Sequence, residues 1–178
     1  MIKISLVELN ALDTASFAKV LFGVYEHSPW VITEAERCRP FGTLKELQAS
    51  CEAAIDRASP EAQVLLIKAH PDLAVKLDQL PHLTEFSQSE QSKAGFAMLA
   101  PAEIDELRAE LIRYRVRFGH PFILCVSEYS AVDVLPILKT RMQSEPNTEK
   151  CNCLSQITRI GWHRLCSIIE NPHETSPL

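Results

Sequence analysis

Apolar residues recur at helical spacing along nearly the whole chain, and this periodicity is the feature that most restricts the possible fold. One early face carries them at positions i, i+3, i+4 and i+7: Phe17, Val20, Leu21 and Val24. The stripe of the last long segment contains Leu154, Ile157, Ile160, Gly161, Leu165 and Ile168. The sequence therefore predicts an all-α fold, a single-domain bundle of about eight to nine helices.

Capping residues and prolines predict where the helices of the first half begin and end. Asp13 is expected to cap the first helix, which should end near Pro29 because proline disfavours helix in the residue before it. Thr43-Leu44-Lys45-Glu46 has the pattern of a capping box and predicts a helix through Ala58. The next helix should start at Ser59-Pro60 and end at His70-Pro71.

The second half of the chain carries similar signals. A helix is expected from Pro101 to Phe118, with Gly119 just after its end, and the final helix from about Asn147 to Ile169. The run Pro121–Val126 is the one apolar stretch that could be extended. Ser130 is expected to cap the helix that follows it.

Length and composition favour one domain. A chain of 178 residues with 46% hydrophobic content can bury one sizeable core, so we expect a domain over residues 1–170 and a tail over 171–178. The net charge of −5 argues against a nucleic-acid partner, because such proteins carry basic surfaces. No segment is apolar enough to span a membrane, and no secretory signal is evident. A cytoplasmic protein without membrane contact is expected.

The six cysteines predict reduced thiols rather than a disulfide framework, because they are scattered through apolar or helical contexts. Cys151-Asn152-Cys153 could suggest a zinc site, but no second pair of ligands follows at a suitable spacing. We therefore expect no metal. The arginines of Arg113-Tyr114-Arg115-Val116-Arg117 are expected to form a solvated helix face.

Three charged or titratable residues stand out, and each has a structural as well as a functional interpretation. Arg164 falls on the apolar side of the last helix, so it needs an anionic partner, either a carboxylate side chain or a bound ligand. His70 at a helix end could complement the helix dipole or act as a general acid/base. Glu90 could simply cap a helix by reaching back to Ser87.

Several short sequence motifs, among them those that contain His70, Glu90 and Arg164, follow one another in a recognisable order along the chain. They are Glu26-His27-Ser28-Pro29-Trp30, Arg39-Pro40-Phe41, Ala69-His70-Pro71-Asp72-Leu73, Ser87-Gln88-Ser89-Glu90-Gln91, Ala94-Gly95, Arg117-Phe118-Gly119-His120-Pro121-Phe122-Ile123, Arg141, and Ile157 through Arg164-Leu165. In these blocks the chain closely resembles the OHCU decarboxylases, the 2-oxo-4-hydroxy-4-carboxy-5-ureidoimidazoline decarboxylases of urate degradation. The resemblance covers the chain from about Leu6 to Ile169.

The resemblance implies an OHCU decarboxylase-like all-α fold, a carboxy-lyase without a cofactor, and a homodimer. By matching positions, His70 resembles the catalytic histidine of the family and Glu90 its partner acid. The residues that would line the substrate site are Pro71, Ser87, Gln91 and Arg164. The segment Phe122-Ile123 resembles the one that offers backbone groups to the ligand.

The function implied is conversion of the anionic substrate OHCU to (S)-allantoin. An anionic substrate would also explain a buried guanidinium at Arg164. Two alternatives remain open. One is a related decarboxylase or hydrolase that acts on another ureido or imidazoline acid. The other is a non-catalytic helical binding module, although the presence of both His70 and Glu90 counts against it.

Overall fold

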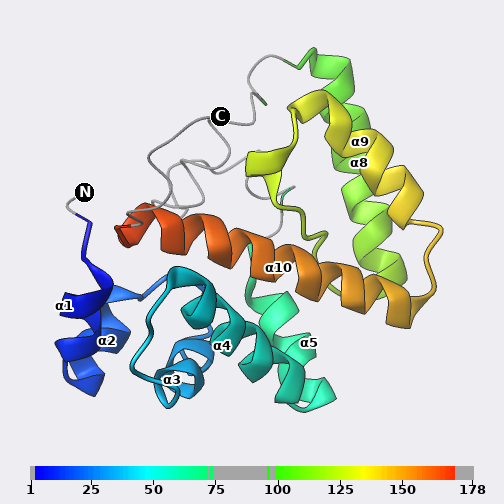
Figure 1. Cartoon of the computed structure of the whole chain (residues 1–178). Coiled ribbons are helices and arrows are strands. Elements are labelled where there is room, and N and C mark those ends of the chain that lie inside the picture. The colour runs from blue at the N-terminus through cyan, green and yellow to red at the C-terminus, as the bar shows by residue number, and fades with distance from the viewer. Residues whose placement is uncertain (1–2, 72, 74–95, 97–98, 171–178) are drawn as a thin grey trace. The chain divides into compact units, whose positions relative to one another are not determined.

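The computed structural model describes residues 3–71, 73, 96 and 99–170, and in this part of the chain all long elements are helical (Figure 1). The described residues form eight α-helices: α1 (Leu6–Ala11), α2 (Thr14–Val20), α3 (Trp30–Glu36), α4 (Leu44–Arg57), α5 (Pro60–Ala69), α8 (Pro101–Phe118), α9 (Ala131–Arg141) and α10 (Pro146–Ile168). A short 3₁₀ helix, η3, covers Val126–Glu128. The predicted all-α class is confirmed.

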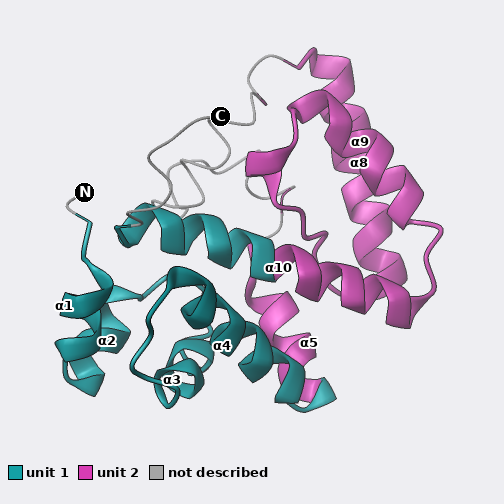
Figure 2. Cartoon of the chain, viewed as in Figure 1, with its two compact units in different colours: residues 1–60, 158–178 teal, residues 61–157 magenta. Residues whose placement is uncertain are grey.

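The chain divides into two compact units (Figure 2). Unit 1 contains residues 1–60 and 158–178, and unit 2 contains residues 61–157. The long helix α10 contributes its first half to unit 2 and its second half to unit 1. The single domain expected over residues 1–170 stays a prediction, because compact units in one chain can still fold together.

Unit 1 is built around the helices of the first 60 residues. Helix α3 packs against both α2 and α4. Buried side chains from these helices and from the second half of α10 form its interior, among them Phe17, Leu21, Val31, Leu47, Ile55 and Leu165. An isolated parallel bridge joins Ile4 to Ile169, so the beginning of the described chain is tied to the end of α10.

Unit 2 has a separate apolar cluster, and α8 packs against α9 within it. The cluster consists of Leu73, Phe96, Leu107, Leu111, Tyr114, Phe122, Leu124, Val126, Ala131, Val134 and Leu138. The buried residues of α8, which are Leu107, Leu111 and Tyr114, repeat at the spacing of one helix face.

Most predicted helix boundaries are confirmed. Thr43 caps α4 by accepting a hydrogen bond from the Glu46 amide, although the Glu46 carboxylate bonds to the Gly42 amide rather than to Thr43. Gly119 follows α8 with a φ of 73°, the left-handed conformation that glycine adopts readily. Ser130 caps α9 together with Asp133.

Two boundary predictions in the first thirty residues are wrong. The helix that Asp13 caps ends at Val20 instead of continuing toward Pro29. A preceding helix, α1, was not predicted; it is six residues long and begins with a capping box formed by Ser5 and Glu8. So short a helix is marginal by propensity alone, and tertiary packing of buried Leu9 supports it.

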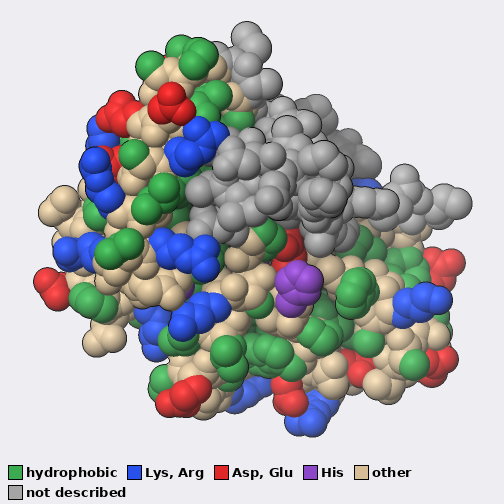
Figure 3. Space-filling model, turned by 180° about the vertical axis from the view of Figure 1, so that it is seen from behind, with side chains coloured by type: hydrophobic (Ala, Val, Ile, Leu, Met, Phe, Trp, Pro, Cys, Tyr) green, Lys and Arg blue, Asp and Glu red, His purple; other side chains and the backbone are tan. Residues whose placement is uncertain are grey.

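The described surface carries charged side chains of both signs among hydrophobic ones, as Figure 3 shows for one face. Arg113, Arg115 and Arg117 are all exposed, which confirms the expected solvated face of α8. Among the described residues, no helix combines the length and the apolar character that a membrane span requires.

Candidate functional site

The predicted site residues fall into three groups in the structure. His70, Pro71, Phe122 and Ile123 belong to unit 2, and Arg164 belongs to unit 1. Ser87, Glu90 and Gln91 lie outside the described residues. The convergence of His70, Glu90 and Arg164 on one substrate site therefore stays a prediction.

His70 lies directly after the last residue of α5 and is 6% exposed. Its Nδ1 is 3.0 Å from the carbonyl oxygen of Leu66, one turn earlier. A carbonyl oxygen can only accept, so Nδ1 must carry the hydrogen, and in the neutral ring the lone pair is then on Nε2. The Nε2 atom is inaccessible to bulk water. The helix thus fixes both the orientation and the tautomer of this imidazole, as a general base requires.

Arg164 lies on the buried side of α10, as its position in the apolar stripe predicted, and is 2% exposed. Its Nη2 donates to Oε1 of Glu26 at 2.8 Å, and Nη1 donates to the carbonyls of Gly23 at 3.0 Å and Val24 at 3.3 Å. Of the two anionic partners that the sequence left open, the structure shows the carboxylate. These contacts fix the plane of the guanidinium.

The loop that holds Arg164 has an unusual backbone. Gly23 has a φ of 87° and His27 a φ of 51°, and both values lie in the left-handed region. Between them, Tyr25 packs directly on Gly161, one turn before Arg164, where a Cβ would come within 2.7 Å of the tyrosine ring. The absence of a side chain at Gly161 therefore lets α10 approach this loop closely enough for Arg164 to reach its carbonyls.

The segment 121–126 is buried along its whole length but forms no strand. A buried backbone without a sheet must find other hydrogen-bond partners, and here side chains supply several of them. The Ile123 carbonyl accepts from Nη1 of Arg141 at 2.5 Å, and the Cys125 amide donates to Oε1 of Gln156 at 2.9 Å. The run that could have been an extended strand therefore forms no strand, and its last residue, Val126, begins η3.

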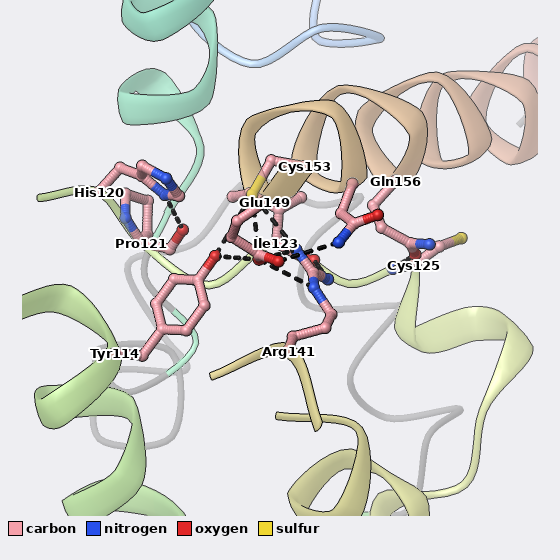
Figure 4. A network of polar contacts seen from close by, with 10 residues as sticks. Tyr114, His120, Pro121, Ile123, Cys125, Arg141, Glu149, Cys153 and Gln156 are labelled. Carbon is pink, nitrogen blue, oxygen red and sulfur yellow. Dashed lines mark hydrogen bonds and ion pairs between the residues drawn. The ribbon is translucent and has the colours of Figure 1, made fainter. Parts of the chain in front are cut away.

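A buried polar network surrounds this segment (Figure 4). At its centre Oε1 of Glu149, whose side chain is completely buried, accepts from Nε of Arg141 at 2.9 Å and from Nη2 at 2.5 Å. The same oxygen accepts from the Tyr114 hydroxyl. Oε2 accepts from the Asn152 amide at 3.0 Å. Both oxygens of the carboxylate are therefore satisfied by protein groups.

The electrostatics of the network keep Tyr114 neutral and Arg141 charged. Burial raises the pKa of Tyr114 far above its usual value, and the neighbouring Cys153 and Glu149 raise it further. Burial also raises the pKa of the Cys153 thiol, while Tyr114 and Arg141 oppose that rise. For Arg141, burial lowers the pKa, but the hydrogen bonds to Glu149 and the electrostatic interactions with Cys153, Glu149 and Tyr114 together outweigh burial, so the net pKa is raised.

Sequence reasoning missed this network, although one signal was present. Glu149 lies four residues before Cys153 and eight before Ile157, so it continues the apolar stripe of α10 toward the helix start. A carboxylate in that position needs a buried cation just as Arg164 needs an anion. Its partner Arg141 comes from the preceding helix, a pairing that periodicity cannot identify.

Comparison with known proteins gives consistent results along the chain. The family profile described as OHCU decarboxylase matches residues 10–166. A 2-oxo-4-hydroxy-4-carboxy-5-ureidoimidazoline decarboxylase from Haloferax volcanii is 32% identical over 165 residues, which are 93% of this chain and 96% of the relative. The uric acid degradation bifunctional protein PucL of Bacillus subtilis is 34% identical over 168 residues, but this chain spans only 33% of its length.

Solved structures show the same fold. The crystal structure of an (S)-allantoin synthase superposes with a TM-score of 0.76 at 28% identity, covering 94% of this chain and 54% of the other. An OHCU decarboxylase structure superposes with a TM-score of 0.67 at 22% identity over 83% of this chain and 96% of the other, a likeness that concerns the fold alone.

Proposed function

The chain belongs to the OHCU decarboxylase family, and on that premise we propose that it converts OHCU to (S)-allantoin with release of carbon dioxide. The observation that carries the proposal beyond family membership is His70, whose Nδ1 contact to Leu66 leaves the basic lone pair on Nε2. An imidazole whose tautomer is fixed in this way can transfer a proton to or from a bound substrate.

The reaction needs no external electron acceptor. When the carboxylate leaves as carbon dioxide, the electron pair remains on the ring carbon, and the adjacent C=N bond of the imidazoline can take it up. The protein must orient the scissile carboxylate, stabilise the charge that moves into the ring, and deliver a proton to one face of the intermediate. Delivery to a single face yields one enantiomer of allantoin.

We assign the proton transfer to Nε2 of His70, with Glu90 as the acid that sets the charge of the imidazole or binds the ring and ureido N–H groups. Pro71, Ser87 and Gln91 would line the site, and the segment Phe122-Ile123 would offer backbone groups to the ligand. These assignments rest on the resemblance of the matching positions.

Arg164 would bind the carbonyl or ureido oxygens of the substrate. The planar guanidinium of Arg164 would then be kept in one orientation by Glu26 and by the carbonyls of Gly23 and Val24. The alternative is a purely structural ion pair. Arg164→Lys separates the two, because lysine keeps the charge beside Glu26 but loses the fork. We expect a KM at least tenfold higher, on the order expected for a lost charged hydrogen bond; an unchanged KM would make the pair structural.

The central test is His70→Asn. The asparagine amide can still donate to the Leu66 carbonyl in place of Nδ1, but nothing replaces Nε2, so the fold should survive while proton transfer fails. We expect kcat to fall by about 10²–10⁴, measured as formation of optically active allantoin from freshly generated OHCU. An undiminished rate would remove His70 from the mechanism.

His27→Asn is the matched control for this experiment. His27 is exposed and has a φ of 51°, a conformation that asparagine adopts readily, so its replacement should leave the rate unchanged. A panel of other ureido and imidazoline acids distinguishes a related decarboxylase or hydrolase. Binding of (S)-allantoin without any turnover would instead indicate a binding module.

We also propose that the protein acts as a homodimer in the cytoplasm. All six cysteines lie among the described residues and none of them forms a disulfide there, which fits a reducing compartment. Light scattering after gel filtration should give twice the chain mass of 20.0 kDa, and a single-chain mass would contradict the dimer. Cell fractionation tests the location.

A further inference from the structure

The main chain of Ile123 is held by a side chain at its carbonyl. This carbonyl accepts from Nη1 of Arg141 at 2.5 Å. Two residues later, Gln156 binds the Cys125 amide. Because segment 121–126 has no strand partner, these side chains determine where its backbone lies.

Arg141 is itself fixed on three sides. Glu149 binds its Nε and Nη2, the Ile123 carbonyl binds its Nη1, and its guanidinium lies 4.6 Å above the centroid of the Phe122 ring. A planar fork held in this way can neither rotate nor slide without breaking a charged hydrogen bond. Its contact with Ile123 is therefore rigid.

Tyr114 and Glu149 form a second layer behind Arg141. The Tyr114 hydroxyl donates to the same Glu149 oxygen that accepts from Arg141, and its ring packs edge-on against Phe122 at a centroid distance of 5.1 Å. Tyr114 thus touches both the carboxylate that aligns the guanidinium and the residue next to Ile123. Removing its hydroxyl should loosen the arrangement without leaving a charge unpaired.

We propose that Arg141, supported by Glu149 and Tyr114, is a positioning residue that sets the backbone of Phe122-Ile123 for substrate binding. This inference rests on the proposed function, in which that backbone contacts OHCU. Arg141 acts through the Ile123 carbonyl and the Phe122 ring and does not itself touch the substrate. Displacing such a backbone by about 1 Å is sufficient to reduce catalysis by up to about a hundredfold.

Unit 1 contains a natural control with the same local design. Arg39 pairs with Glu36, donates to the Leu12 carbonyl at 2.6 Å and lies 4.8 Å above the Phe17 ring. It therefore has a carboxylate, a carbonyl and an aromatic ring as neighbours, as Arg141 does. No residue of this second constellation is placed at the proposed site, so Arg39→Lys reports what such a substitution does to stability alone.

The experiment compares Arg141→Lys, Tyr114→Phe and Arg39→Lys by thermal midpoint, kcat and KM for OHCU, and the Kd for (S)-allantoin. Lysine at position 141 can pair with Glu149 but cannot also hold the Ile123 carbonyl. We expect KM and Kd to rise about 10- to 100-fold in Arg141→Lys and about two- to fivefold in Tyr114→Phe, within the range that misplacement produces. Arg39→Lys should lower the midpoint while leaving KM unchanged. Should Arg141→Lys fail to fold, Tyr114→Phe carries the test.

A second readout does not depend on activity. The ¹³C shift of the Ile123 carbonyl, measured without ligand, should move in Arg141→Lys and in Tyr114→Phe and stay constant in Arg39→Lys. If the carbonyl moves but the wild-type protein neither converts OHCU nor binds (S)-allantoin, the proposed function fails while Arg141 still sets this backbone. If the carbonyl stays in place, or if KM follows only the thermal midpoint in all three variants, the positioning role is overturned.

Discussion

Each unit of this protein contains a buried arginine–glutamate pair, and the two pairs are built in opposite ways. In unit 1, Arg164 on α10 meets Glu26 from a loop 138 residues earlier in the chain, and its Nη1 donates to two carbonyls of that loop. In unit 2, Arg141 and Glu149 are only eight residues apart, and Tyr114, Asn152 and Cys153 complete the cluster. The first pair ties a loop to a helix, whereas the second supports segment 121–126, which has no strand partner.

In each unit, the buried charge pair holds the backbone beside it in place. A buried ion pair seldom stabilises a fold more than apolar packing would, because desolvation offsets the attraction. Here both guanidinia also donate to main-chain carbonyls, at Gly23 and Val24 in one unit and at Ile123 in the other. Fixing irregular backbone is a task that an apolar side chain could not perform.

The largest expected effect follows from removing either carboxylate. Glu149→Ala and Glu26→Ala each leave a buried guanidinium without its anion, which should cost about 3–5 kcal/mol of unfolding free energy. Glu149→Ala should cost more, because Tyr114 and Asn152 lose their acceptor as well. Urea titrations measure both values. A loss below about 1 kcal/mol would show that water or a rearranged partner replaces the carboxylate.

The same titration of Glu149→Ala tests whether residues 1–170 form one domain. Both tryptophans, Trp30 and Trp162, belong to unit 1, so their fluorescence reports that unit although the substitution is in unit 2. Because α10 contributes to both units, we expect the fluorescence midpoint and the circular dichroism midpoint to shift together. Separate transitions would instead indicate two independent folding units.

An intermediate effect distinguishes a glycine needed for space from one needed for backbone conformation. Gly161→Ala in unit 1 places a methyl group 2.7 Å from the Tyr25 ring and should cost about 1–3 kcal/mol by overpacking. Gly119→Ala in unit 2 has no atom within 4 Å of the new Cβ but a φ of 73°, and should cost about 1 kcal/mol. Asparagine should recover part of the loss at position 119 and none at 161. If asparagine recovered the same share of stability at both positions, Gly119 would not be needed for its backbone conformation and Gly161 for space.

The effect that is smallest at neutral pH concerns the buried thiols. Burial raises the pKa of Cys51 in unit 1 to about 12, whereas in unit 2 Tyr114 and Arg141 oppose the rise at Cys153. A raised pKa stabilises the fold fully below the unfolded pKa, and that contribution disappears as the pH rises toward the folded value.

Stability should therefore fall between pH 8 and 10, with Cys51 contributing at most about 1.4 kcal/mol per pH unit. Urea titrations at both pH values measure how much the free energy of unfolding falls from pH 8 to pH 10. This fall should be smaller in Cys51→Ala than in wild type, and Cys153→Ala should differ less from wild type than Cys51→Ala does. An identical fall in wild type and Cys51→Ala would exclude the thiol as its source.

Local signals in the sequence predicted a large part of this structure. The capping residue Thr43, Gly119 after α8 and the long stripe of α10 each encode a boundary or a face through neighbours a few residues away. The failures occur where distant contacts override propensity. Helix α1 depends on burial of Leu9, and α2 ends at Val20 although the apolar spacing continues.

At the candidate site, too, the sequence predicted what nearby residues encode and missed what distant contacts decide. Periodicity placed Arg164 on a buried face and proline placed His70 at a helix end, and both positions are confirmed. The roles proposed for His70, Glu90 and Arg164 came from the resemblance of sequence blocks, since spacing does not encode chemistry. The Tyr114–Glu149–Arg141 network was not foreseen, because its members come from three different helices.

The sequence by itself determined the helical class, most helix ends and the need for an anion near Arg164, because each depends on residues close together in the chain. Only the tertiary structure decided that Glu26 supplies this anion and that Arg141 holds the backbone at Ile123. The physical reason is that hydrogen bonds and charge pairs act over a few ångströms in space, whatever the separation of their partners along the chain.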